Sequence, residues 1–255
     1  MVLVIVGLAC GFVDSSLGMG YGVTSASVLV SFGIAPALAS ASVHSAEAFV
    51  DAISAGSHLK LGNVRKDILV PMLIFGTFGA VLGAAGLSFL ALNAAKPIVS
   101  LILLIMGSVI LIKFLFRWKK SDNDCSSEQK DVKYSKKKIS LLSFIAGFVD
   151  ASGGGGWGPI LTPAFVATGS SPRKAIGTVE FTEPIISLAV VITFGLLVGF
   201  ETFLWNLVLP VVLGGLILTP LAAYFCSRIP KRLLGILVGA WIVFLNIRTL
   251  LLLLL

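Results

Sequence analysis

Apolar residues run along this chain in long stretches that short polar segments separate. The longest stretches lie at about 68–92, 97–116, 184–200, 203–226 and 233–255. A helix that crosses the hydrocarbon core of a bilayer needs roughly 20 apolar residues. The pattern therefore predicts an all-α polytopic membrane protein.

Two places in the chain carry apolar pieces that are too short for a full crossing. These pieces are 2–13 with 23–32, and 139–149 with 159–167, and a glycine-rich segment joins each pair. Such lengths favour half-helices or re-entrant segments. We predict a short broken or re-entrant helical hairpin followed by three transmembrane helices in each half. Five tilted crossings in each half are the alternative.

The two halves are copies of one sequence unit. Residues 11–47 align without a gap to 147–183, with 14 identities in 37 positions, and GFVDSSLGMGYG matches GFVDASGGGGWG. We divide the chain into a first membrane repeat at 1–118, a polar linker at 119–138 and a second membrane repeat at 139–255.

Lysine and arginine placement predicts that the repeats are inverted. Basic residues gather in the segments 60–66, 119–138, 168–174 and 228–232, whereas 199–203 has none. Cytoplasmic loops carry an excess of Lys and Arg, so these four segments, the linker among them, should be cytoplasmic and both termini outside. Each half then crosses the membrane an odd number of times, which makes the copies antiparallel.

Composition supports a membrane location and excludes other classes. Hydrophobic residues make up 57% of the chain and charged residues 12%, with a mean hydropathy of +1.04. The net charge of +7 arises mostly at the ends of apolar runs and in the linker, so it predicts helix orientation rather than nucleic-acid binding. The three cysteines are far apart in sequence and indicate neither a disulfide framework nor a metal cluster.

The glycine-rich turns are the first candidate site. They read DSSLGMGYG from Asp14 and DASGGGGWG from Asp150. Irregular backbone at membrane depth is tolerated where it lines protein or a wet cavity, and the N-termini of the following helices would favour an anion. The alternative is that the glycines only permit close helix packing. The turn residues that we assign to substrate binding are Ser16, Gly18, Gly20, Tyr21, Gly22, Ser152, Gly154, Gly156, Trp157 and Gly158.

Ionisable residues at membrane depth form the second candidate site. His44, Glu47 and Asp51 share one helix face by their spacing, and Glu180 and Glu183 occupy matching positions in the second copy. Charged groups inside a bilayer usually mark pathways, and desolvation favours the neutral carboxyl form. We predict proton coupling or a pathway role for Asp14, His44, Glu47, Asp51, Asp150, Glu180 and Glu183. A paired packing network is the alternative.

Hydroxyl groups lie beside these residues. Ser42, Ser45, Thr178 and Thr182 could bind a small oxyanion, or could bond to carbonyl groups of their own helices. The six acids at membrane depth suit a proton or a cation better than a free anion. An anion would require the acids to be protonated or backbone dipoles to dominate.

The glycine-rich openings, the G-x-x-P steps at 33–36 and 169–172 and the SHLKLGNV run at 57–64 together resemble the TauE/SafE family of sulfite exporters. The runs SVHSAEAFVDAISAGSH at 42–58 and GTVEFTEPIIS at 177–187 are similar to one prokaryotic branch of that family, in which the second run often has Asn where this chain has Glu180. The resemblance implies a multi-pass permease of the prokaryotic inner membrane that moves small, often sulfur-containing anions such as sulfite or sulfonates. It also implies that proton movement is coupled to this transport.

We therefore predict a secondary transporter that exports a small anion, in a lipid bilayer and without a cofactor. The alternatives are a proton-coupled cation or metal carrier, which the acid-rich stripe favours, and an ion channel. A metal site is not predicted, because no cysteine pair or compact His/Asp ligand set is present. An enzyme is not predicted, because no nucleophile–base spacing stands out.

Overall fold

The computed structural model describes residues 2–117, 135–168, 170–225 and 231–254. Within these residues every regular element is a helix, which confirms the all-helical prediction. The first half contains α1 (Val2–Leu17), α2 (Tyr21–Ser31), α3 (Pro36–Lys60), α4 (Leu69–Phe89) and α5 (Leu92–Ile112). The second contains α6 (Lys136–Gly153), α7 (Trp157–Ala167), α8 (Pro172–Phe194), α9 (Trp205–Phe225) and α10 (Lys231–Leu254).

Single-turn segments extend or join these helices. They are the 3-10 turns Lys66–Ile68 and Phe200–Thr202 and the π-helical turns Lys113–Arg117 and Gly195–Gly199. Each half thus shows two helices around a glycine turn, followed by three longer helices. The predicted linker at 119–138 lies almost entirely outside the described residues.

The helices around the glycine turns are longer than the sequence pattern predicts. The apolar runs end at 13 and 149, but α1 continues to Leu17 and α6 to Gly153. Gly18 and Gly154 then adopt φ angles of 64° and 75°. This left-handed conformation ends a helix at low cost when the residue is glycine, and each glycine N–H still bonds back to an aspartate carbonyl, at 2.6 Å and 2.7 Å.

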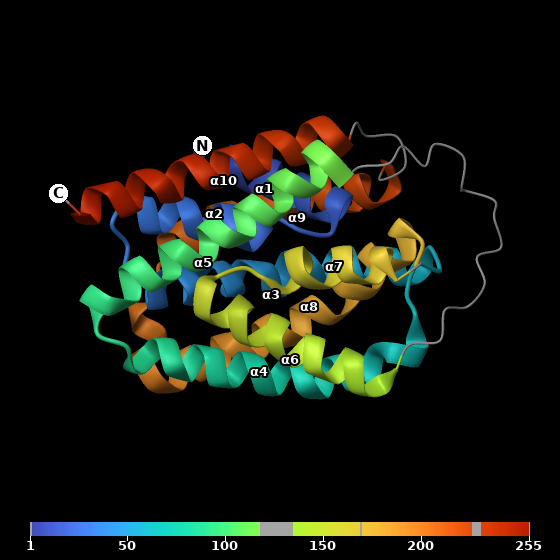
Figure 1. Ribbon diagram of the computed structural model, residues 1–255, viewed down its shortest axis with the longest axis horizontal. Helices are drawn as coiled ribbons and strands as arrows, with labels where there is room; N and C mark the ends of the chain where they lie inside the picture. Colours follow the sequence, from blue (N-terminus) through green and yellow to red (C-terminus); the bar gives the residue numbers. More distant parts are fainter. Residues whose placement is uncertain (1, 118–134, 169, 226–230, 255) are drawn as a thin grey trace.

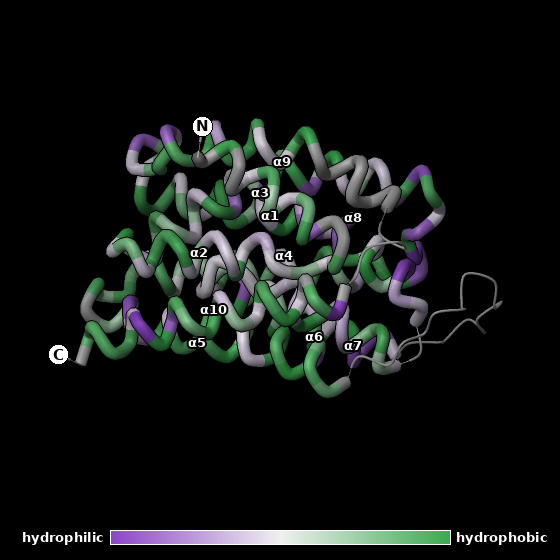
Figure 2. The backbone as a smooth tube through the Cα atoms, turned by 90° about the horizontal axis from the view of Figure 1, so that it is seen from above, coloured by the Kyte–Doolittle hydropathy of each residue, from purple (hydrophilic) through white to green (hydrophobic). Residues whose placement is uncertain are grey.

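The outside of the molecule is apolar, as a lipid environment requires. In the part of the chain that the structure describes, four stretches are long and apolar enough to cross a membrane: 66–89, 94–116, 172–202 and 235–253. Large hydrophobic side chains along α4, such as Val70, Ile74 and Phe78, are exposed, and Figure 2 shows mostly hydrophobic residues along the helices. A surface this apolar is stable in a bilayer and not in water.

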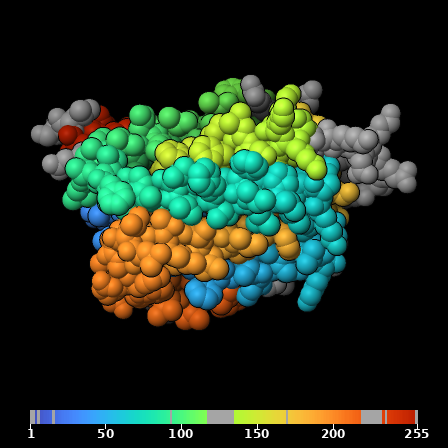
Figure 3. Space-filling view, turned by 90° about the horizontal axis from the view of Figure 1, so that it is seen from below, coloured from blue at the N-terminus to red at the C-terminus, as the bar shows by residue number. Residues whose placement is uncertain are grey.

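Helices from the two halves pair reciprocally around a central pair. α3 and α8 pack side by side in the middle, α1 packs along α9, and α4 packs along α6. α5 packs along α10. Figure 3 shows α4 lying between α6 and α8 on one face of the molecule. Each half therefore completes the packing of the other.

The molecule has two chemically different ends. At the end that lies at the right in Figure 1, α3 stops and α4, α6, α8 and α10 begin. We call it the basic end, because its helix termini and joining segments carry Lys60, Arg65, Lys66, Lys136, Lys137, Lys138, Arg173, Lys174 and Arg232. Lys96 and Arg248 lie near the opposite end.

Candidate functional site

The aspartate before each glycine turn holds the start of the next helix. Asp150 Oδ1 accepts hydrogen bonds from the backbone N–H groups of Gly156, at 2.7 Å, and Trp157, at 3.1 Å. In the first copy, Asp14 Oδ1 accepts one bond from the N–H of Tyr21, at 3.1 Å. These N–H groups are ones that we expected to face a ligand. The aspartates stabilise α2 and α7 in the way that a capping residue does.

The two glycine turns touch at their backbones. A Cβ added to Gly22 would lie 2.8 Å from the carbonyl oxygen of Gly154, and one added to Gly158 would lie 2.6 Å from the carbonyl oxygen of Gly18. Thr162 Oγ1 on α7 also donates to the Gly18 carbonyl, at 2.8 Å. These glycines therefore permit close packing between the copies, and their role in substrate binding stays a prediction.

Other predicted turn residues face neighbouring helices. Gly20 lies against Val13 and Val238, and Ser152 lies against Gly83 on α4. Gly156 packs against its own Asp150 backbone. Ser16 belongs to α1, but its side chain lies outside the described part of the structure.

The two aromatic turn residues have different surroundings. Trp157 is buried, and its Nε1 donates to Thr182 Oγ1 on α8 at 3.2 Å. Tyr21 is buried too, and its hydroxyl finds no hydrogen-bond partner among the described residues. The Tyr21 side chain interacts electrostatically with the carboxylates of Asp14, Glu47 and Asp51.

The predicted oxyanion-binding hydroxyls are not gathered at one point. Thr178 Oγ1 accepts the N–H of Arg65 at 3.0 Å, near the basic end. Ser42 Oγ, which matches Thr178 in the repeat, accepts the N–H of Leu204 at 3.2 Å at the opposite end. Each of these contacts, which we call the loop clamps, ties a loop of one half to the central helix of the other. Ser45 donates to the carbonyl of its own helix, at 2.7 Å.

The ionisable residues, in contrast, come together between the copies. His44 on α3 lies 2.8 Å from the Glu47 carboxylate through Nδ1. Its Nε2 lies 3.3 Å from the backbone carbonyl oxygen of Asp150 and 3.9 Å from the Asp150 carboxylate. Ser187 on α8 lies 3.3 Å from Nδ1. His44 therefore links α3 to α6 and α8 in the interior.

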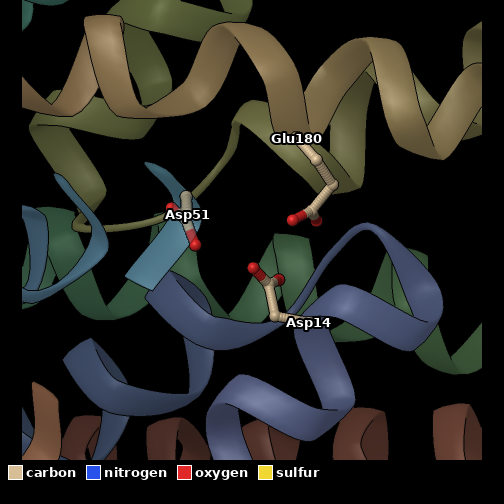
Figure 4. A group of neighbouring side chains, drawn as sticks. All are labelled: Asp14, Asp51 and Glu180. Atoms are coloured by element: carbon tan, nitrogen blue, oxygen red, sulfur yellow. The ribbon is translucent and has the colours of Figure 1, made fainter. Parts of the chain in front are cut away.

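Two overlapping groups of buried carboxylates lie beyond His44, on the side of the basic end. Asp14, Asp51 and Glu180 each offer an oxygen within 4.8 Å of the others, and so do Glu47, Asp51 and Glu183. All five side chains are buried, and Asp51 belongs to both groups. Figure 4 shows Asp14, Asp51 and Glu180 pointing toward one another. The sequence placed these residues on one path but did not indicate such compact groups.

Ser54 also belongs to this site, although the sequence pattern did not single it out. Its hydroxyl donates to Glu180 Oε2 at 2.6 Å, across the interface of α3 and α8. Ser54 continues the spacing of His44, Glu47 and Asp51 along α3. That helical periodicity was the signal that could have identified it.

Comparisons with known proteins show similarity over almost the whole chain. Residues 3–249 match the family described as "Sulfite exporter TauE/SafE". A curated relative, the "Probable membrane transporter protein YtnM" of Bacillus subtilis (strain 168), is 45% identical over 251 residues, which cover 98% of this chain and 82% of that protein. No solved structure matches the chain significantly.

Proposed function

This chain belongs to the TauE/SafE family of membrane transporters, and we propose that it is a secondary transporter that exports a small sulfur-containing anion such as sulfite or a sulfonate. The observation that carries the proposal is the buried network of ionisable groups where the two copies cross. Ionisable groups in a membrane interior are costly and mark transport pathways. The anion class rests on the family, whose description names sulfite.

Alternating access around the central α3–α8 pair is the proposed mechanism. The sequence repeat and the reciprocal pairing of α1 with α9 and of α4 with α6 support two inverted halves that rock against each other. The loop clamps lie at opposite ends of the molecule, so one can open while the other remains closed. Opening the Arg65–Thr178 clamp would expose the interior to the basic end, and opening the Leu204–Ser42 clamp would expose it to the other side.

Protons are the proposed link between the acids and the anion. Glu47 and Glu183 occupy matching positions midway along α3 and α8, and Glu47 contacts His44 directly. A neutral Asp150 would hold the N–H groups of Gly156 and Trp157 less strongly than a carboxylate does. Protonation would thus release donors at the start of α7 for an anion.

The basic end is proposed to face the cytoplasm of a prokaryotic cell, with the linker on the same side and both termini outside. In a variant whose Cys125 and Cys226 are replaced by serine, a membrane-impermeant maleimide should label Glu201→Cys in intact cells. It should label Lys174→Cys only after permeabilisation. The reverse pattern would invert the orientation.

Flux measurements in proteoliposomes test the function. We expect ³⁵S-sulfite efflux that responds to an imposed pH gradient, and we expect Glu47→Gln to lose that response. Glu201→Gln is the matched control, because it makes the same change on an exposed side chain outside the network. The absence of gradient-sensitive flux for sulfite and for simple sulfonates would reject the proposal.

A further inference from the structure

Three carboxylates from three different helices converge in the interior. Asp14 comes from α1, Asp51 from α3 and Glu180 from α8, and their exposed fractions are 3%, 1% and 0%. One oxygen of each lies within 4.8 Å of the others. Calcium and similar cations take oxygen ligands at about 2.3–2.6 Å. Three evenly spaced oxygens contact one ion at these lengths when they lie about 4.0–4.5 Å apart, so shifts of a few tenths of an ångström would bring this group onto a single ion.

Unpartnered oxygens in the group point independently to a ligand. Asp14 Oδ2, Asp51 Oδ2 and Glu180 Oε1 are buried and accept no hydrogen bond from the described residues. The second oxygen of two of these carboxylates is held in place, because Asp14 Oδ1 accepts the Tyr21 N–H and Glu180 Oε2 accepts the Ser54 hydroxyl. Buried oxygens without partners are costly, and a bound cation would satisfy several at once.

The donor atoms select a class of ion. Carboxylate oxygens suit hard cations such as Ca²⁺, Mg²⁺ or Mn²⁺, whereas thiolate and imidazole ligands favour zinc and copper. His44 is directed at Glu47 and Asp150 instead. We propose that Asp14, Asp51 and Glu180 form a site for a hard divalent cation that is carried together with the anion, an inference that rests on the proposed function above.

This site assigns separate tasks to the two parts of the network. The proton step belongs to His44, Glu47 and Asp150, where an acid–base pair is already in contact. The cation neutralises the other acids, which otherwise repel an approaching anion. Asp51 also belongs to the group with Glu47 and Glu183. An ion can therefore pass from one group to the other while Asp51 stays bound.

Binding of Mn²⁺ to the purified full-length chain in nanodiscs tests the site, because free Mn²⁺ gives an electron paramagnetic resonance signal that binding suppresses. We expect saturable binding of Mn²⁺ that Ca²⁺ displaces. Asp51→Asn and Glu180→Gln should each weaken it at least tenfold, and Glu201→Gln should not change it. Thermal unfolding in detergent checks that the variants fold. If one variant does not fold, the other decides.

Two results would overturn the site: no saturable Mn²⁺ or Ca²⁺ binding at neutral pH, or equal affinity in the folded Asp51→Asn and Glu180→Gln variants. Anion flux tests the joint movement separately. Sulfite efflux should fall at least tenfold when chelators remove divalent cations from both sides. Efflux that persists unchanged rejects cotransport and leaves the exporter proposal intact. Saturable cation uptake without any anion flux rejects the exporter proposal and identifies the cation as the cargo.

Discussion

Replacing the aspartate before each glycine turn tests whether it holds the following helix in place. Alanine at position 150 would leave the buried N–H groups of Gly156 and Trp157 without their acceptor. Alanine at position 14 would leave only the N–H of Tyr21. A buried donor without a partner costs about 1–3 kcal/mol. The acceptor should therefore be worth about 2–6 kcal/mol of unfolding free energy at Asp150, and about half that at Asp14.

Replacing Asp150 by asparagine distinguishes the effect of the hydrogen-bond acceptor from the effect of the negative charge. Asp150→Ala and Asp150→Asn both remove a buried carboxylate and its contact with His44, but only asparagine keeps a carbonyl oxygen for the two N–H groups. The difference in stability between them therefore isolates the hydrogen bonds. The same pair of variants at Asp14 is the internal comparison.

Unfolding in mixed micelles of increasing SDS content, followed by far-ultraviolet circular dichroism, measures these differences. We expect Asp150→Ala to unfold at clearly lower SDS than Asp150→Asn, with a smaller gap between Asp14→Ala and Asp14→Asn. If the difference between the alanine and asparagine variants at position 150 is absent, or no larger than that at position 14, Asp150 does not hold α7 through these two hydrogen bonds.

Two further predictions concern the contacts between the copies. Gly22→Ala should destabilise the protein by several kcal/mol in the same unfolding assay, because its methyl group would meet the backbone carbonyl oxygen of Gly154 in the other copy at 2.8 Å. Gly56→Ala, in α3 with no atom within 4 Å, should change stability by less than about 1 kcal/mol, and equal losses would show that the copies are not closely packed at Gly22. Thr178→Val should raise amide hydrogen exchange at Arg65, whose N–H loses its acceptor; unchanged exchange there would show that the clamp does not hold the loop.

The lengths of the apolar runs predicted the long helices well, because a helix that crosses a bilayer needs roughly 20 apolar residues. The apolar runs from 68 and from 233 correspond to α4 and α10 within a few residues. The glycine turns were found because a duplicated motif is visible without any structure. Their boundaries were misjudged because α1 and α6 continue through polar residues up to the first left-handed glycine.

The chemistry of the site was less predictable, because it depends on contacts between distant segments. The spacing of His44, Glu47 and Asp51 placed them on one helix face. That spacing says nothing of Asp14, which reaches Asp51 only because α1 crosses α3 in the fold. Ser42 and Thr178 match in the alignment, yet their partners are loops of the opposite halves. The alignment contains no information about those partners.

The reciprocal pairing of helices has a consequence for biosynthesis. While the ribosome makes the first half, α1 and α4 are in the membrane before their partners α9 and α6 exist. α4 gains its neighbour soon, when α6 is inserted, but α1 waits until α9 near the end of the chain is made. The nascent protein therefore passes through a long stage in which a polar-faced α3 lacks its companion α8. Insertion factors must shield that face until α8 (Pro172–Phe194) has been made.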